Sequence, residues 1–150
     1  MSGLGCKTAE SLRLLAFAVA ALSAADAPAF ADVVPIEASL TGGSEAPPND
    51  SPATGQLEGT LDTDTNTLEW TVTYSGLTGP ALSADFHGPA PLGENAPIEV
   101  GTPGALASPF HGVARIDATQ VNDLKAGRWY FNLHSKTFPA GEIRGPVVRR

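Results

Sequence analysis

The sequence has 150 residues, with 9 Lys and Arg against 16 Asp and Glu, which gives a formal net charge of −7 at pH 7. An acidic chain of this kind lacks the basic surface that binds nucleic acid or an anionic membrane, so we expect neither as a partner. The length allows one domain with a core of modest size.

The first 31 residues are typical of a cleavable secretory signal peptide. Lys7 and Arg13 give a basic start, and residues 14–25 form an apolar run. Ala29-Phe30-Ala31 then supplies a cleavage motif of small residues. Cleavage there would leave Asp32 as the new N-terminus. The alternative interpretation is a buried N-terminal helix.

The signal peptide bears on location and on redox chemistry. Its apolar run is shorter than the roughly 20 residues that cross a bilayer, so we expect no membrane span in residues 32–150. The single cysteine, Cys6, lies in the expected signal, and the exported domain would therefore have no disulfide. We expect a secreted or periplasmic protein with one domain over residues 32–150.

Strand patterns recur from Asp32 onward, without helical periodicity. Apolar residues alternate along residues 33–41, which predicts a first strand. A loop rich in Gly and Pro follows, and a second strand is marked by Leu57, Gly59 and Leu61. Residues 62–66 form a turn rich in Asp and Asn, and strict alternation from 67 to 74 completes a hairpin.

The middle of the chain predicts shorter strands between loops. We expect strands over residues 81–89, 97–101 and 110–118, separated by segments dense in Pro and Gly. Residues 118–126 predict one helical turn or a structured bend before Gly127.

The end of the chain reads as a β-hairpin. Trp129, Phe131 and Leu133 alternate with Tyr130, Asn132 and His134, and because successive strand side chains point to opposite faces, the two sets face opposite ways. Residues 138–141 form a Pro- and Gly-containing turn, and residues 142–147 resume as a strand. The pattern places an amide and an imidazole on the side away from the apolar face.

About eight short strands with turn-rich connections and almost no helix predict an all-β fold. The short links favour antiparallel pairing, in a β-sandwich or a barrel. Within this fold, the sequence allows two structural roles for Arg144. It pairs with Glu142 on the surface, or it buries its guanidinium against loop carbonyls, which we favour.

Several motifs, in order, resemble the CHRD (chordin-type) domain. They are L-T-G-G-S-E-A-P-P (40–48), G-x-L-x-G (55–59), Y-S-G-L (74–77), F-H-G-P-A (86–90), L-K-A-G-R-W-Y-F-N-L-H-S (124–135) and P-A-G-E-I-R-G (139–145). The resemblance covers essentially all of residues 33–148. It implies an antiparallel, Greek-key-like β-sandwich, in the stand-alone exported form found in bacteria. The family's central block usually reads H-x-H-x-G, and here Asp85 takes the place of the first His.

The histidines suggest a metal site on the outer face of the sheet. Asp85 and His87 are two residues apart, hence on one face of their strand, and His134 lies opposite the apolar face of its own. If these strands are neighbours, two imidazoles and a carboxylate converge. The family's H-x-H block is similar in spacing to the H-x-H strand of copper–zinc superoxide dismutase, so by this analogy copper or zinc is the expected ion. We include His111 as a further candidate ligand.

Two functions follow from different features of the sequence. The whole-chain resemblance favours an exported CHRD-type binding module whose partner is a protein or a small ion, with no catalytic residue assigned. The histidines favour a copper- or zinc-binding protein, and copper would allow redox activity. Bound metal in the purified protein would discriminate between the two.

Overall fold

The computed structural model describes residues 32–150, and the expected signal peptide lies outside them. The described part consists mainly of short strands with one α-helix. In chain order the elements are β1 (Val33–Thr41), the 3₁₀ turn η1 (Gly42–Ser44), β2 (Thr54–Asp62), β3 (Thr67–Ser75), β4 (Ala81–His87), β5 (Ile98–Gly101), β6 (Phe110–Arg115), α1 (Ala118–Lys125), β7 (Tyr130–Ser135), β8 (Ile143–Pro146) and β9 (Val148–Arg149).

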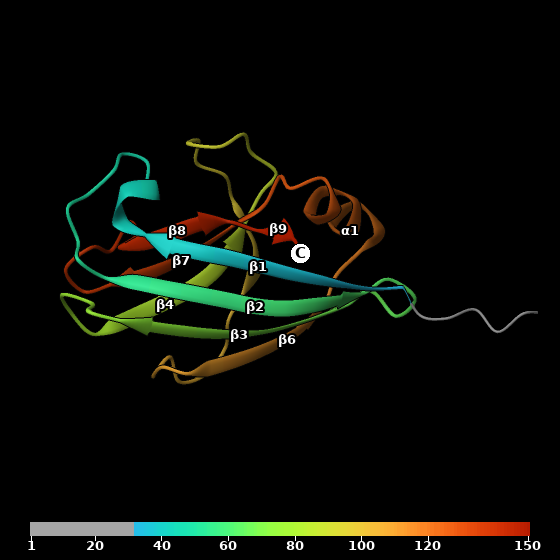
Figure 1. The fold of residues 1–150 in the computed structure, drawn as a ribbon, viewed down its shortest axis with the longest axis horizontal. Coiled ribbons are helices and arrows are strands. Elements are labelled where there is room, and N and C mark those ends of the chain that lie inside the picture. Colours follow the sequence, from blue (N-terminus) through green and yellow to red (C-terminus); the bar gives the residue numbers. More distant parts are fainter. Residues whose placement is uncertain (1–31) are drawn as a thin grey trace, which may run out of the picture.

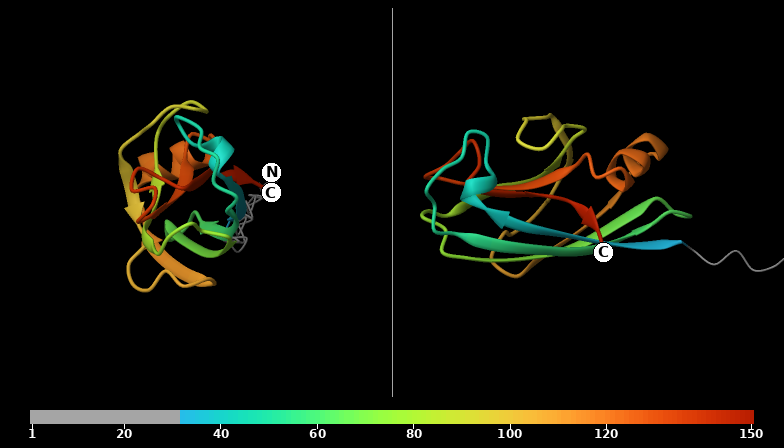
Figure 2. Two further views of the ribbon diagram at one scale, coloured as in Figure 1. Left: turned by 90° about the vertical axis from the view of Figure 1, so that its left-hand side faces the viewer. Right: turned by 45° about the horizontal axis from the view of Figure 1, so that its top comes forward.

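The strands form one antiparallel sheet that folds over on itself. Its order is β5-β4-β7-β8-β1-β2-β3-β6, with β9 paired to β1. The fold lies between β8 and β1, which share the single register pair Thr41 and Arg144. On one side of it lie β5, β4, β7 and β8, and on the other β1, β2, β3 and β6 (Figures 1 and 2). This confirms the expected all-β antiparallel sandwich of about eight strands.

The hairpin of β2 and β3 shows why the local sequence forms these strands. All nine residues of each strand pair in continuous register, from Thr54 opposite Ser75 to Asp62 opposite Thr67. The turn is fixed by Asp62, whose Oδ1 accepts hydrogen bonds from the backbone N–H groups of residues 64 and 65, both at 2.9 Å. Asn66 takes the left-handed conformation, at φ 55°, that the turn needs.

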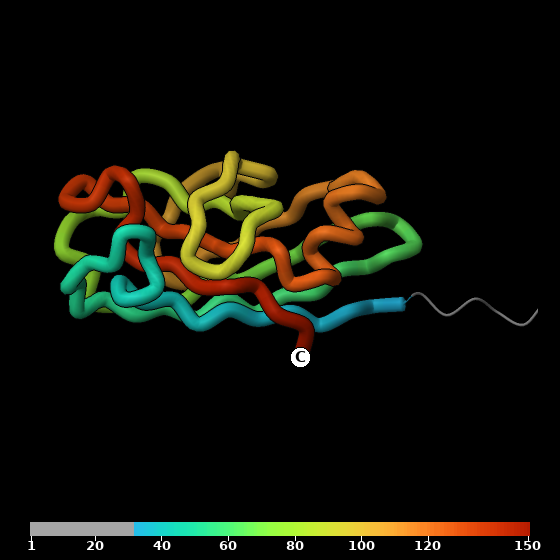
Figure 3. The backbone as a smooth tube through the Cα atoms, turned by 90° about the horizontal axis from the view of Figure 1, so that it is seen from above, coloured from blue at the N-terminus to red at the C-terminus, as the bar shows by residue number. Residues whose placement is uncertain are grey.

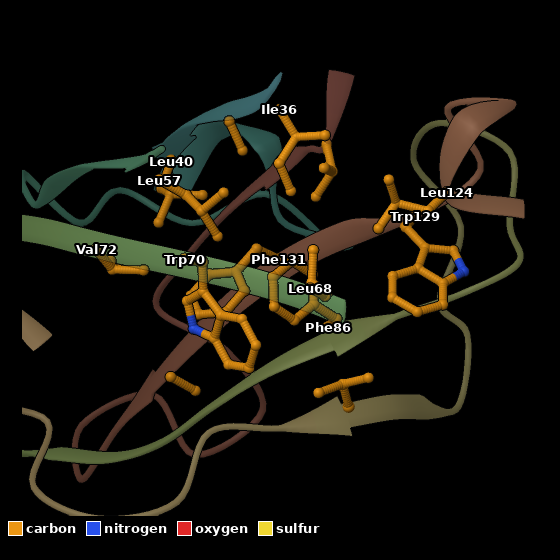
Figure 4. Close-up of a cluster of buried hydrophobic side chains, with 14 of the residues drawn as sticks. Ile36, Leu40, Leu57, Leu68, Trp70, Val72, Phe86, Leu124, Trp129 and Phe131 are labelled. Carbon is orange, nitrogen blue, oxygen red and sulfur yellow. The ribbon is translucent and has the colours of Figure 1, made fainter. Parts of the chain in front are cut away.

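The core fills the space between the two halves of the sheet (Figure 4). Phe86 lies at its centre, with ring centroids 5.0 Å from Trp70 and 4.8 Å from Phe131, both in edge-to-face geometry that aromatic rings prefer. Trp70 and Trp129 are 3% and 1% exposed, which confirms the side of the strand predicted for each.

Two elements differ from the sequence prediction. Residues 118–125 form an eight-residue α-helix rather than a single turn, because Asp117 and Gln120 make a reciprocal capping box at its start. Val121 and Leu124 join the core, and Gly127 ends the segment at φ 70°. The last strand is divided into β8 and a short β9 that pairs with β1. Within the described residues, no helix is long and apolar enough to cross a membrane.

Candidate metal centre

The outer face of β4, β7 and β8 is polar and yet buried. Two loops lie over it, the β1–β2 loop (residues 42–53) and the β4–β5 loop (residues 88–97), which are side by side in Figure 3. We call the buried polar side chains between these loops and the sheet, including Glu45 of the β1–β2 loop itself, the polar layer. Its members are Glu45, Asp85, His87, Tyr130, Asn132, His134 and Arg144, of which all but His134 are less than a tenth exposed.

The register of β4 against β7 gathers the predicted ligands. Asp85 lies opposite Asn132, while Ser83 pairs with His134 and His87 pairs with Tyr130. The two imidazoles therefore flank the Asp85–Asn132 pair and lean toward each other, with ring centroids 6.0 Å apart. His134 Nε2 lies 3.7 Å from Asp85 Oδ2. One potential ligand atom from each of Asp85, His87 and His134 lies within 4.8 Å of the other two.

Backbone carbonyls fix the tautomer of both histidines. His87 Nδ1 is 3.0 Å from the carbonyl oxygen of Ala96, and His134 Nδ1 is 3.1 Å from that of Pro139. A carbonyl only accepts, so each Nδ1 carries a proton and donates it, and in the neutral form of the ring the lone pair is then on Nε2. Both Nε2 atoms are buried without a hydrogen-bond partner among the described residues.

The surroundings keep His87 neutral. Burial lowers the pKa of His87 below its usual value of 6.5, and His134 and Arg144 lower it further. The hydrogen bond to the Ala96 carbonyl and the charge of Asp85 oppose this shift without cancelling it. A neutral imidazole is the form that ligates a metal, so the site holds His87 ready for an ion at neutral pH.

The geometry suits one ion bound by two nitrogens and a carboxylate. Two ligand atoms on one tetrahedral zinc at about 2.1 Å are about 3.4 Å apart. The 3.7 Å separation of His134 Nε2 and Asp85 Oδ2 is close to this value, and the His87 ligand atom lies within 4.8 Å of both residues' ligand atoms. In metalloproteins a ligating histidine typically donates its other N–H to a carbonyl or carboxylate, as both histidines do here.

The structure does not bring His111 to this cluster. His111 lies on β6, at the end of the sheet order farthest from β5 and β4. It is exposed, and its Nδ1 lies 2.8 Å from Thr71 Oγ1 on the neighbouring strand. The sequence placed it on a strand correctly, but the order of strands across the sheet separates it from His87 and His134.

Sequence reasoning missed the row of side chains next to the cluster. Tyr130 stacks on His87 with ring planes 2° apart and centroids 4.9 Å apart. Because β7 lies between β4 and β8, Arg144 flanks Tyr130 from the other side, with Cζ 4.6 Å from the ring centroid. The sequence signal was the shared face of Tyr130 and His134, which indicated this row only in part.

Arg144 buries its guanidinium against loop carbonyls, which confirms the role favoured from the sequence. Its Nε donates to the Ser44 carbonyl at 2.6 Å, and its Nη1 donates to Asn95 Oδ1 at 2.9 Å. The charged group nearest to it is Glu45, with the closest oxygen 3.9 Å from Nε. Burial raises the pKa of Glu45 to about 7, although Arg144 acts to lower it.

Glu142 does not form the alternative surface pair with Arg144. It is fully buried, and its Oε1 accepts hydrogen bonds from Ser51 Oγ and from the backbone N–H of Thr78, both at 2.7 Å. Burial alone would raise the pKa of Glu142, but its hydrogen bonds, such as those from Ser51 and Thr78, outweigh that effect and the pKa is lowered. Glu142, which lies in the connection between β7 and β8, thus joins the β1–β2 and β3–β4 loops to this connection.

The fold and the polar layer together define an all-β sandwich domain with a candidate ion site under two loops. The family model described as "CHRD domain" matches residues 36–147. This chain belongs to the CHRD domain family. No curated protein and no solved structure matches the chain. Two of the motif blocks recognised in the sequence carry the cluster, since His87 ends β4 in F-H-G-P and His134 lies in the Y-F-N-L-H stretch of β7.

Proposed function

We propose that this CHRD domain is an exported metal-binding protein that holds one zinc or copper ion between Asp85, His87 and His134. The observation that carries the proposal is the pair of buried, unpartnered Nε2 atoms whose opposite ring nitrogens are anchored to carbonyls. A buried polar atom without a partner costs about 1–3 kcal/mol, and a bound ion would supply the missing partner for both rings.

The donor set favours zinc or copper over harder cations. Calcium and magnesium prefer six or more oxygen ligands, whereas imidazole suits zinc and copper. The Asp85 carboxylate is a harder ligand than the histidine that usually occupies this place in the family, and it shifts the preference from Cu(I) toward zinc or Cu(II). Three protein ligands leave room for a water molecule or another small ligand on the ion.

A purely structural role for the histidines explains less of the geometry. Such a role accounts for the two Nδ1 contacts with the Ala96 and Pro139 carbonyls. It leaves both Nε2 atoms without a hydrogen-bond partner, in a cluster where one potential ligand atom of each ring lies within 4.8 Å of one from Asp85. Buried polar side-chain atoms are hydrogen-bonded in the large majority of cases, so two in one cluster require an explanation.

The amount of metal bound to the purified protein tests the proposal directly. The protein purified after expression of the full chain is stripped with a chelator, loaded with excess Zn(II) or Cu(II), dialysed and analysed for bound metal. We expect about one ion per chain. For the Cu(II) form, electron paramagnetic resonance should show hyperfine coupling to imidazole nitrogen.

Variants locate the ion. His134→Ala and His87→Ala should each lose stoichiometric metal, because two ligands are too few to hold the ion through dialysis. The matched control is His111→Ala, which removes an imidazole outside the cluster and should keep the full metal content. Circular dichroism establishes that each variant is folded. A wild-type protein that retains no metal, or equal loss in the His111 variant, would show that the proposal is wrong.

A further inference from the structure

A cavity of about 620 Å³ lies beside the ion cluster, between the β1–β2 loop and the β4–β5 loop. The loops meet through a hydrogen bond of 3.1 Å from Asn95 Nδ2 to the carbonyl of Ala46. The volume of the cavity is in the range of sites for small organic ligands, about 300–1,000 Å³. Its walls are mainly apolar and include Pro47, Pro48, Pro91, Leu92, Trp129 and Pro146.

Tyr130 separates this cavity from the ion cluster. The Tyr130 side chain lines the cavity and also stacks on His87, whereas none of the three candidate metal ligands lines the cavity. Its hydroxyl accepts a hydrogen bond of 3.1 Å from the backbone N–H of Ala96, which holds the ring in place. A molecule in the cavity would therefore contact the protein without ligating the ion.

Arg144 gives the cavity a single cationic group. Among the residues that line it, Arg144 and Glu45 are the charged ones. The guanidinium uses Nε and Nη1 for loop acceptors, while Nη2 makes no hydrogen bond to the described residues. The fully buried polar atoms without a hydrogen-bond partner do not include Nη2, so this atom keeps some contact with solvent. Nη2 is thus a donor without an acceptor among the described residues, on a side chain that lines a mainly apolar cavity.

Glu45 is an incomplete counterion for this guanidinium. Its nearest oxygen is 3.9 Å from Arg144 Nε, which is too long for a hydrogen bond. Glu45 is only 7% exposed, and burial raises the pKa of its carboxyl group to about 7, so this group is about half ionised at neutral pH. Buried charges in proteins are normally paired and hydrogen-bonded, so the site has room for one further negative charge.

We propose that this cavity binds a small apolar monocarboxylate, with the carboxylate on Arg144 Nη2 and the apolar chain against the Pro and Leu92 wall. A planar carboxylate matches the guanidinium, and its single charge matches the single cation. A doubly charged phosphate would exceed the available positive charge, and an ammonium head would meet Arg144 with like charge. The proposal is independent of the ion site and does not rest on it.

Matched ligands test the head group and the tail. Isothermal titration calorimetry at pH 7 compares decanoate with decanol and decylamine, which share the ten-carbon chain, and with acetate, which lacks it. We expect decanoate to bind at least about tenfold more tightly than each of the other three, since the tail and the charge both contribute. Equal binding of decanol, or no binding of decanoate, would overturn the proposal.

Surface variants locate the binding site without disturbing Arg144, whose loss could unfold the loops. Leu92 lines the cavity and is 79% exposed, so Leu92→Asp should keep the fold and weaken decanoate binding about tenfold or more. The control is Leu82→Asp, at a 49% exposed leucine outside the cavity, which should leave the affinity unchanged. Equal affinity of both variants would place the ligand elsewhere.

Two further variants separate this site from the ion cluster. Glu45→Gln removes the competing carboxylate and should bind decanoate about tenfold more tightly than the wild type at pH 8, where Glu45 is ionised. Metal-free His134→Ala should bind decanoate as the wild type does. If decanoate bound only to metal-loaded protein, the carboxylate would be ligating the ion, and the Arg144 site would be wrong.

Discussion

His87 and His134 use their two ring nitrogens differently from a histidine that only fills space. In each ring one nitrogen contacts a backbone carbonyl, and the other is buried without a hydrogen-bond partner among the described residues. The carbonyls come from loops, while the rings come from neighbouring strands. This division fixes the ring orientation before a ligand arrives, which is how rigid ion sites in proteins are prepared.

At the residue scale, the raised pKa of Glu45 also predicts how the stability of the protein changes with pH. Its pKa of about 7 in the folded protein lies above the ordinary value of 4.5, so the folded state binds more protons than the unfolded state between these pH values. The stabilisation from this group is therefore complete below pH 4.5 and is lost as the pH rises to 7. Its upper magnitude is about 3 kcal/mol, at 1.36 kcal/mol for each pKa unit.

Urea unfolding of the wild type and Glu45→Gln between pH 4.5 and 8 measures this contribution. The amide resembles the protonated carboxyl, so the two proteins should be of similar stability near pH 4.5. The wild type should become the less stable of the two as the pH approaches 8. A stability difference that stays constant across this range would contradict the raised pKa of Glu45.

At the scale of elements, the connections matter as much as the strands. The two loops over the polar layer are held by side chains from the strands below them. Arg144 donates a hydrogen bond to the Ser44 carbonyl, and the Tyr130 hydroxyl accepts one from the backbone N–H of Ala96. Glu142 extends the same arrangement to residues 51 and 78. Helix α1 joins β6 to β7 and packs Leu124 into the core cluster beside Trp129.

The start of α1 should depend on its capping box. Asp117 Oδ1 accepts hydrogen bonds from the backbone N–H groups of Thr119 and Gln120 at 2.8 and 2.9 Å. Asp117→Ala leaves these donors without a partner and should lower the free energy of unfolding by about 0.5–2 kcal/mol. Asp117→Asn keeps an acceptor and should cost less. Equal stability of all three proteins in urea would show that packing alone holds the helix.

At the scale of the whole molecule, one folded sheet produces two buried layers of opposite character. The apolar core lies between its halves, and the polar layer lies on the outside of β4, β7 and β8 beneath the loops. An ion or a small anion in the polar layer would bind the folded state and not the unfolded chain, and so would stabilise the fold by mass action. We therefore expect the Tm of the protein to increase when either proposed ligand is added.

Export is the remaining expectation for the whole chain. Expressed in full in a bacterial host, the protein should be recovered outside the cytoplasm with Asp32 as its first residue, because signal peptidase cleaves after small residues such as those at 29 and 31. Intact mass measurement and N-terminal sequencing of the periplasmic and culture-medium fractions provide the check. Exported protein that still began at Met1 would contradict the assignment.

The sequence by itself determined most of the strands, because the alternation of apolar and polar side chains is a local property of the chain. It gave β1 its bounds, placed both tryptophans in the core and put Asp85 and His87 on one face. It could not order the strands across the sheet, since that order depends on contacts between distant segments. Only the tertiary structure therefore brought His134 next to Asp85 and left His111 on the far strand.

The burial of the polar face was likewise decided only by the tertiary structure. Loops have no periodicity, so nothing in residues 42–53 or 88–97 indicates that they lie over β7. Arg144 reaches the Ser44 carbonyl across 100 positions of sequence, and Glu45 meets that guanidinium in the same way. The sequence determined which side chains leave the apolar core, and long-range packing decided that they meet one another rather than water.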